Sequence, residues 1–167
     1  MNRFIIILFA ALAAGPAAAQ EVVFSPAATE ACLDGLSDPA LFTTCIGASA
    51  NQCMEDTQGG WSTVGMSGCY EQERLYWDAR LNAAYKEVRA EAKKMDAEMA
   101  EIGSSAPKQA DALRDMQRAW IAYRDATCDY ERSLWGGGTG GGPATVSCHM
   151  YMTAEQTRYL ETAGFGE

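Results

Sequence analysis

Two central segments of the chain repeat apolar residues at the three- and four-residue spacing of an amphipathic helix. The first, residues 69–102, contains no glycine or proline, and the second spans residues 113–134. We expect two long antiparallel helices, with the second stripe forming a core seam along the first helix rather than a ligand site. The stripes are Trp77, Leu81, Ala84, Val88, Ala92, Met95, Met99 and Ile102 in the first segment, and Leu113, Met116, Trp120, Tyr123, Thr127, Tyr130 and Leu134 in the second.

The residues between these segments predict where one helix ends and the next begins. Gly103 can adopt the left-handed geometry that commonly ends a helix. Ser104 or Ser105 is expected to cap the second helix, with Pro107 in its first turn.

Shorter helices are expected before this pair. Residues 26–36 form one, and residues 39–56 form another whose start is capped by Ser37 or Asp38. The glycine- and serine-rich residues 59–68 are expected to form a loop.

A last helix is expected after a glycine-rich segment at residues 135–145. That segment lacks the lysine and the following serine or threonine of a phosphate-binding P-loop, so we interpret it as a flexible connection. The last helix covers residues 146–163 and ends at Gly164, with Thr153 as an alternative start. The sequence thus predicts an all-α fold, a small disulfide-stapled helical bundle built on two long antiparallel helices.

The N-terminal residues have the pattern of a secretory signal peptide. Arg3 precedes an apolar run, and small residues end at Ala19. We expect cleavage of residues 1–19, leaving residues 20–167 as a single domain without membrane insertion. No cysteine follows the cleavage point to carry a lipid anchor. The sequence therefore predicts an exported protein, periplasmic or secreted.

The six cysteines are expected to form three local disulfides, because an exported chain with an even number of cysteines favours pairing. Antiparallel neighbours bring together residues that are equidistant from the turn between them. The pairs predicted on this basis are Cys32 with Cys45, Cys53 with Cys69, and Cys128 with Cys148.

The formal net charge is −9, and loss of Arg3 with the signal makes it one unit more negative. This charge disfavours nucleic acid and anionic membrane surfaces as partners and favours encounter with basic proteins.

The sequence offers no arrangement that points to catalysis, a metal or a cofactor. His149 is the only histidine, and no cysteine is left unpaired to act as a nucleophile. Two acidic pairs, Glu71 with Glu73 and Asp125 with Asp129, are interpreted as solvated helix faces rather than hydrolase carboxylates.

Three polar or aromatic residues are candidates for other roles. Arg124 lies beside the seam and is expected to pair with a carboxylate on the first long helix, such as Asp78, with a partner contact as the alternative. Asn82 is expected to orient a group across the helix interface. Trp61 lies in a glycine-rich loop, where an aromatic residue is a candidate interface anchor.

The segments WDARLNAAY (77–85) and LRDMQRAWIAYRDATC (113–128), followed by a glycine-containing loop and Cys148, resemble the LprI-type lysozyme-inhibitor N-terminal domain family. The resemblance covers about residues 69–160, so the cysteines before Cys69 lie outside it. It implies a small exported helical domain that binds and inhibits lysozyme. The matching residues, which we interpret mainly as scaffold, are Leu81, Asn82, Tyr85, Gln117, Trp120, Tyr123, Arg124, Asp125, Cys128 and Cys148.

These observations favour an exported acidic binding protein whose partner is another protein, a basic lysozyme that it inhibits by occlusion. Animal-type lysozymes are basic, so an acidic inhibitor gains association rate by electrostatic steering. The alternative is a periplasmic protein-interaction or envelope-stress module without lysozyme activity, and an enzyme is the third hypothesis.

Overall fold

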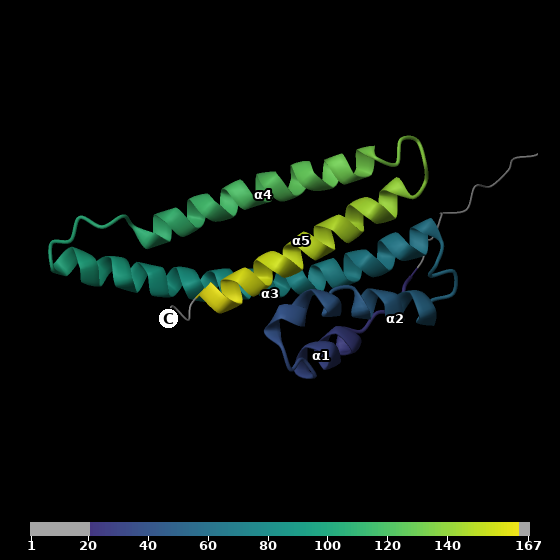
Figure 1. Ribbon diagram of the computed structural model, residues 1–167, viewed down its shortest axis with the longest axis horizontal. Helices are drawn as coiled ribbons and strands as arrows, with labels where there is room; N and C mark the ends of the chain where they lie inside the picture. Colours follow the sequence, from purple (N-terminus) through teal and green to yellow (C-terminus); the bar gives the residue numbers. More distant parts are fainter. Residues whose placement is uncertain (1–20, 164–167) are drawn as a thin grey trace, which may run out of the picture.

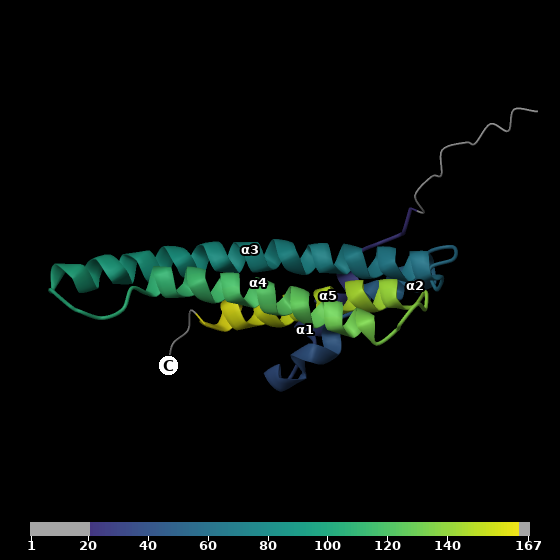
Figure 2. The same ribbon diagram turned by 90° about the horizontal axis from the view of Figure 1, so that it is seen from above.

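The computed structural model describes residues 21–163, and within that range the chain forms helices and no strands. The predicted signal peptide and Gly164 lie outside the described residues. The two long helices, α3 (Thr63–Glu101) and α4 (Gln109–Ser133), run antiparallel, and α5 (Gly141–Ala163) runs diagonally from the end of α4 across α3 (Figure 1). Seen from above, the α3–α4 hairpin extends beyond the end of α5 (Figure 2). The predicted all-α bundle on two long antiparallel helices is confirmed.

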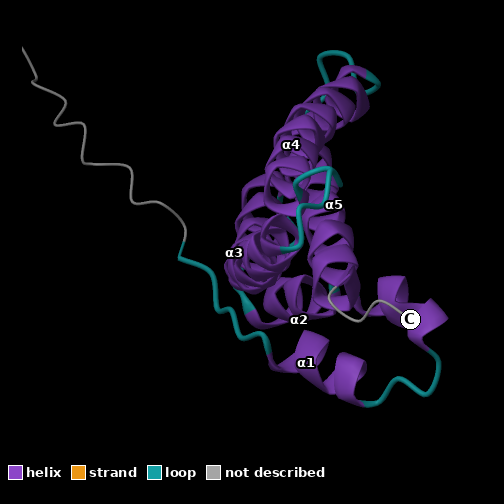
Figure 3. Ribbon diagram, turned by 90° about the vertical axis from the view of Figure 1, so that its left-hand side faces the viewer, coloured by secondary structure: helices purple, strands orange, loops and turns teal. Residues whose placement is uncertain are grey.

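The N-terminal residues form a short layer on the side of α3 and α5 that faces away from α4 (Figure 3). This layer contains α1 (Ala27–Asp34), the 3₁₀ helix η1 (Pro39–Cys45) and α2 (Ala48–Asp56). Asp38 caps η1 as expected, since its side chain accepts a hydrogen bond from the Ala40 N–H at 2.8 Å. The prediction of one helix over residues 39–56 is wrong, because Gly47 has φ +92° and breaks the helical path between η1 and α2.

Helix α3 begins earlier than expected, inside the segment that we predicted to be a loop. The Ser62 hydroxyl accepts a hydrogen bond from the Gly65 N–H at 3.0 Å and caps the helix. A Cβ on Gly65 would lie only 2.4 Å from the Gly59 carbonyl oxygen and 2.5 Å from that of Gly60. The glycine therefore permits close backbone packing within a helix, where composition alone suggested a loop.

The start of α4 also differs from the prediction, because its cap comes from another helix. Neither Ser104 nor Ser105 caps it, and the helix begins at Gln109. The Asp96 carboxylate of α3 instead accepts hydrogen bonds from the backbone N–H groups of Gln109, at 2.7 Å, and Ala110, at 3.0 Å. A carboxylate at this place satisfies free N–H groups and interacts favourably with the helix dipole.

The predicted seam of α4 packs against the core only over its first half, where its side chains are partly buried. Leu113, Met116 and Trp120 pack against Leu81, Ala84 and Leu160, but Tyr123, Tyr130 and Leu134 are exposed. A stripe with a 3.5-residue repeat drifts by about 20° per heptad around a straight helix. Further along α4 the contact surface lies instead at Cys128, which is fully buried and faces α5.

Helix α5 begins at Gly141, within the segment expected to be a flexible connection, and runs without interruption past Thr153. The Thr145 hydroxyl donates a hydrogen bond to the Gly141 carbonyl oxygen at 2.7 Å. Pro143 lies in the first turn, where a backbone N–H has no partner in the helix, so proline is tolerated there.

Three disulfides join Cys32 to Cys45, Cys53 to Cys69 and Cys128 to Cys148, the pairs predicted from the positions of the turns. Each bridges neighbouring elements: α1 to η1, α2 to α3, and α4 to α5. Each closed loop restricts the unfolded chain and contributes about 2–4 kcal/mol of stability.

The apolar core consists of two clusters along α3. The larger surrounds Trp77, whose ring meets Phe42 edge-on at a centroid distance of 5.6 Å. Arg80 joins α3 to α5 beside it, since its guanidinium lies 5.0 Å from the Trp77 ring centroid and pairs with Glu161 at 2.9 Å. The smaller cluster contains Leu81, Ala84 and Leu160, with Tyr85, Leu113, Met116 and Trp120 packed against it.

Glu73 is the polar centre of the fold, and its interpretation as a solvated residue is wrong. The residue is 0% exposed. Its Oε1 accepts hydrogen bonds from the Thr29 hydroxyl at 3.0 Å, the Gly47 N–H at 2.8 Å and the Trp77 indole N–H at 3.1 Å. Its Oε2 accepts one from the Ala50 N–H at 2.7 Å. The carboxylate thus caps α2 from α3 and fixes the N-terminal layer in place.

Candidate functional site

Arg124 of α4 lies at the junction of α3, α4 and α5. Its Nε and Nη2 donate hydrogen bonds to Asp125 Oδ1 at 2.9 and 2.7 Å, and its guanidinium lies 5.0 Å from the centroid of the Trp120 ring. The expected pairing with Asp78 is wrong, because Asp78 accepts a hydrogen bond from Asn82 within α3. Arg124 holds Trp120 and Asp125 in a fixed arrangement.

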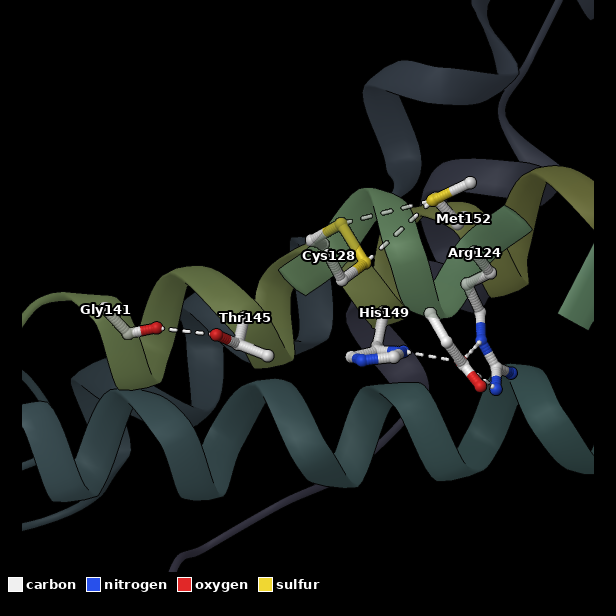
Figure 4. The surroundings of a disulfide bond; sticks show 8 residues. Arg124, Cys128, Gly141, Thr145, His149 and Met152 are labelled. Atoms are coloured by element: carbon white, nitrogen blue, oxygen red, sulfur yellow. Dashed lines mark hydrogen bonds and ion pairs between the residues drawn. A yellow bond between two sulfur atoms is a disulfide. The ribbon is translucent and has the colours of Figure 1, made fainter. Parts of the chain in front are cut away.

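The Cys128–Cys148 disulfide places His149 beside Arg124. Arg124 precedes Cys128 by one helical turn and His149 directly follows Cys148, so the bond brings both side chains to the same end of the junction (Figure 4). His149 Nδ1 lies 3.9 Å from Asp125 Oδ1. Burial, followed by the charges of Arg124 and Arg74, lowers the pKa of His149, although Asp125 and Asp129 oppose the shift.

An open hollow of about 240 Å³ lies beside Arg124 and His149. It is lined by Glu71, Arg74, Arg124, Val146 and His149. Arg74 Nη2 donates a short hydrogen bond of 2.6 Å to Glu71 Oε1, which raises the pKa of Arg74. Each guanidinium at the hollow therefore has its own carboxylate. Both pairs lie within one helix, Arg74 with Glu71 in α3 and Arg124 with Asp125 in α4, so the positive charge at the hollow is already neutralised and the binding of a charged ligand is disfavoured.

A second depression, between α4 and α5, is apolar and open. Its volume is about 390 Å³, and its lining residues are Met116, Ala119, Trp120, Tyr123, Gln156 and Tyr159. We call it the aromatic groove. Tyr123 is 64% exposed and Tyr159 is 55% exposed. Partly exposed tyrosine and tryptophan side chains on a firm helical base are typical of protein interfaces.

The base of the aromatic groove is fixed by a contact between the two helices that form it. Gln156 Nε2 of α5 donates a hydrogen bond to Gln117 Oε1 of α4 at 2.9 Å. Gln117 is one of the residues that carry the family resemblance. Gln117 therefore joins α4 to α5 directly beside the aromatic groove.

The other resemblance residues are divided between core and surface. Leu81 is buried, and Tyr85 packs against its cluster. Asn82 is exposed, and its Nδ2 donates to the backbone oxygen of Asp78 at 2.8 Å and to Asp78 Oδ2 at 3.0 Å. The expectation that Asn82 orients a group across the helix interface is therefore wrong.

Trp61 lies just before α3 and is 60% exposed. It lines neither the Arg124 hollow nor the aromatic groove. The two candidate contact residues from the sequence, Trp61 and Arg124, are therefore not parts of one described depression.

The described residues contain no group of three or more histidine, cysteine, aspartate or glutamate side chains placed to hold a metal ion. In the same part of the chain, no helix combines the length and the apolar character that crossing a bilayer requires.

Residues 53–160 match the family described as "Lysozyme inhibitor LprI". The chain is similar to an uncharacterised 17.7 kDa protein from the puhA 5′ region of Rhodobacter capsulatus, at 28% identity over 140 residues covering 83% of this chain and 86% of the relative. It is also similar to an uncharacterised protein of Rhizobium meliloti (strain 1021), at 30% identity over 114 residues covering 68% of this chain and 82% of the relative. No solved structure matches the chain. Because the matched segment exceeds half of the chain and contains α3 and α4 in full, the protein belongs to the LprI lysozyme-inhibitor family.

Proposed function

We propose that this protein is an exported inhibitor that binds a basic lysozyme and occludes its active-site cleft. The observation that carries the proposal is the match of residues 53–160 to a family described as lysozyme inhibitors. The net charge of −9 supports a basic partner, because opposite charges raise the rate of encounter. The action proposed is binding rather than catalysis.

The proposed form is the mature domain of residues 20–167, located in the periplasm or secreted after removal of residues 1–19. The three disulfides support an oxidising compartment, where such bonds form and persist.

The aromatic groove is the proposed contact surface. Tyr123 and Tyr159 project from two different helices, and Trp120 between them is held by Arg124. Aromatic side chains have few rotatable bonds, so they lose little conformational entropy on binding, and they exclude water over a large area. Arg124 would act mainly by positioning Trp120, and Trp61, which lies outside the aromatic groove, would be a separate anchor.

Alanine substitutions on the groove test this assignment. We expect Tyr123→Ala with Tyr159→Ala to weaken lysozyme binding, measured by titration calorimetry, by about tenfold or more. The matched control is Tyr130→Ala, since Tyr130 is also on α4 and equally exposed, at 64%, but does not line the groove. Equal effects of the control and the groove variants would reject the surface. A folded protein that binds no lysozyme but captures another envelope protein would support the alternative of an interaction module.

A further inference from the structure

Three basic residues that do not line the aromatic groove form a row along one side of α3. Lys86, Arg89 and Lys93 follow one another at intervals of three and four residues. Together with Tyr85 and Ala90 they line an open hollow of about 350 Å³. We call these three residues the basic row.

The basic row keeps its positive charge. Among the described residues, no carboxylate lies within ion-pair distance of Lys86, Arg89 or Lys93, whereas Arg74, Arg80 and Lys94 of the same helix are each paired. Like charges at spacings of three and four residues destabilise a helix. In a chain whose net charge is −9, three adjacent unneutralised cations form a local region of opposite sign.

Arg89 adds an unsatisfied donor to this charge. Its Nε is buried and has no hydrogen-bond partner in the described part of the chain. A buried N–H without an acceptor is costly, so a rotation of the side chain that turns this N–H toward a bound oxyanion would gain a hydrogen bond. The hollow beside Arg124 has no such free donor charge, because Arg74 and Arg124 already donate hydrogen bonds to carboxylates.

We propose that the basic row is a binding site for a phosphate-type oxyanion that carries at least two charged groups. The planar fork of Arg89 suits bidentate contact with one group, and the two lysines neutralise the rest as point charges. Seven residues of helix separate Lys86 from Lys93, a rise of about 10 Å, which exceeds the size of a single phosphate. This site is independent of the proposed contact with lysozyme.

Titration calorimetry of the purified, oxidised protein with pyrophosphate, at constant ionic strength, tests the site. We expect saturable binding that weakens by about tenfold or more in the variant K86Q/R89Q/K93Q, because the charge-assisted hydrogen bonds are lost. The charge-matched control is K108Q/R118Q/R132Q, which removes three cations elsewhere and should retain wild-type affinity. Arg89→Lys keeps the charge and loses the fork, so it should weaken binding even if the triple variant fails to fold.

The source of the phosphate group is distinguished with lipid vesicles. Sedimentation with cardiolipin vesicles, whose headgroup carries two phosphates, but not with phosphatidylcholine vesicles would assign the site to a lipid headgroup if it is lost in K86Q/R89Q/K93Q. Pyrophosphate binding without vesicle binding would assign it to a soluble phosphate compound. Absence of pyrophosphate binding at millimolar concentration, or an equal loss in the two triple variants, would overturn the proposal.

Discussion

Replacing Glu73 by glutamine should strongly destabilise the protein, although the two side chains have almost the same shape. The carboxylate is fully buried and accepts four hydrogen bonds from α1, the η1–α2 junction, α2 and α3 itself. In Glu73→Gln, one oxygen can still serve the three donors that meet at Oε1. The new amide nitrogen then faces the Ala50 N–H, so two donors meet without an acceptor.

The magnitude follows from what is lost at Ala50. A hydrogen bond to a charged group contributes about 1.5–3 kcal/mol, and a negative charge at a helix N-terminus adds about 0.3–1 kcal/mol, or more when partly buried. We therefore expect Glu73→Gln to lower the free energy of unfolding by about 3 kcal/mol. Glu73→Ala should cost more, because it leaves all four donors without their acceptor and opens a cavity.

Urea denaturation with the disulfides intact, followed by circular dichroism, measures this loss. The matched control is Glu71→Gln, two residues away on the same helix, where the side chain is 41% exposed and pairs with Arg74. Its effect should remain within about 1 kcal/mol. A loss below about 1 kcal/mol for Glu73→Gln would refute the argument that this carboxylate anchors the N-terminal layer.

Three other variants test separate features of the structure. Asp96→Ala should lower the free energy of unfolding by about 1–2 kcal/mol, because α4 loses its cap; an unchanged urea midpoint would contradict this. Replacing Cys128 and Cys148 together by alanine should lower it by about 2–4 kcal/mol, and a midpoint equal to that of the oxidised wild type would refute the expected contribution. The pKa of His149 is lowered in the folded state, so the unfolded chain binds the proton more readily. Wild-type stability should therefore fall as pH drops below about 6.5 until it reaches the folded-state pKa, and His149→Gln should flatten this decline in urea midpoints measured across that range. A decline of the same steepness in the variant would assign it to other groups.

The sequence was informative where structure depends on local pattern. The apolar spacing around Trp77 and Leu81 predicted a long helix, and the turns between helices predicted which cysteines pair. Cys128 and Cys148 could be paired because antiparallel helices align residues on either side of one turn. The resemblance to the LprI family also came from short segments, each contained within a single expected helix.

The predictions from the sequence were wrong where a contact between residues distant in the chain determines the local structure. Asp96 caps α4 from another helix, so the serines near that start are not needed. Gly65 lies in a helix because the backbone at Gly59 and Gly60 packs against it. Glu73 resembles its solvated neighbours in sequence, and only the tertiary fold brings Thr29 and the start of α2 to its carboxylate.

The candidate site was only partly predictable for the same reason. Trp120 and Tyr123 follow one apolar stripe in the sequence, yet Trp120 is partly buried against the core and Tyr123 is exposed. Tyr159 completes the aromatic groove from α5, whose irregular apolar spacing gave no signal for it. The diagonal path of α5 across α3 determines which of these residues meet (Figure 1).

The most direct test of the proposed function is the activity of a basic animal-type lysozyme on cell-wall substrate, measured with increasing amounts of the oxidised protein at two salt concentrations. We expect dose-dependent inhibition that weakens at the higher salt concentration, because screening reduces the attraction between an acidic inhibitor and a basic enzyme. Full lysozyme activity in the presence of a micromolar excess of the protein, shown to be folded by circular dichroism, would contradict it.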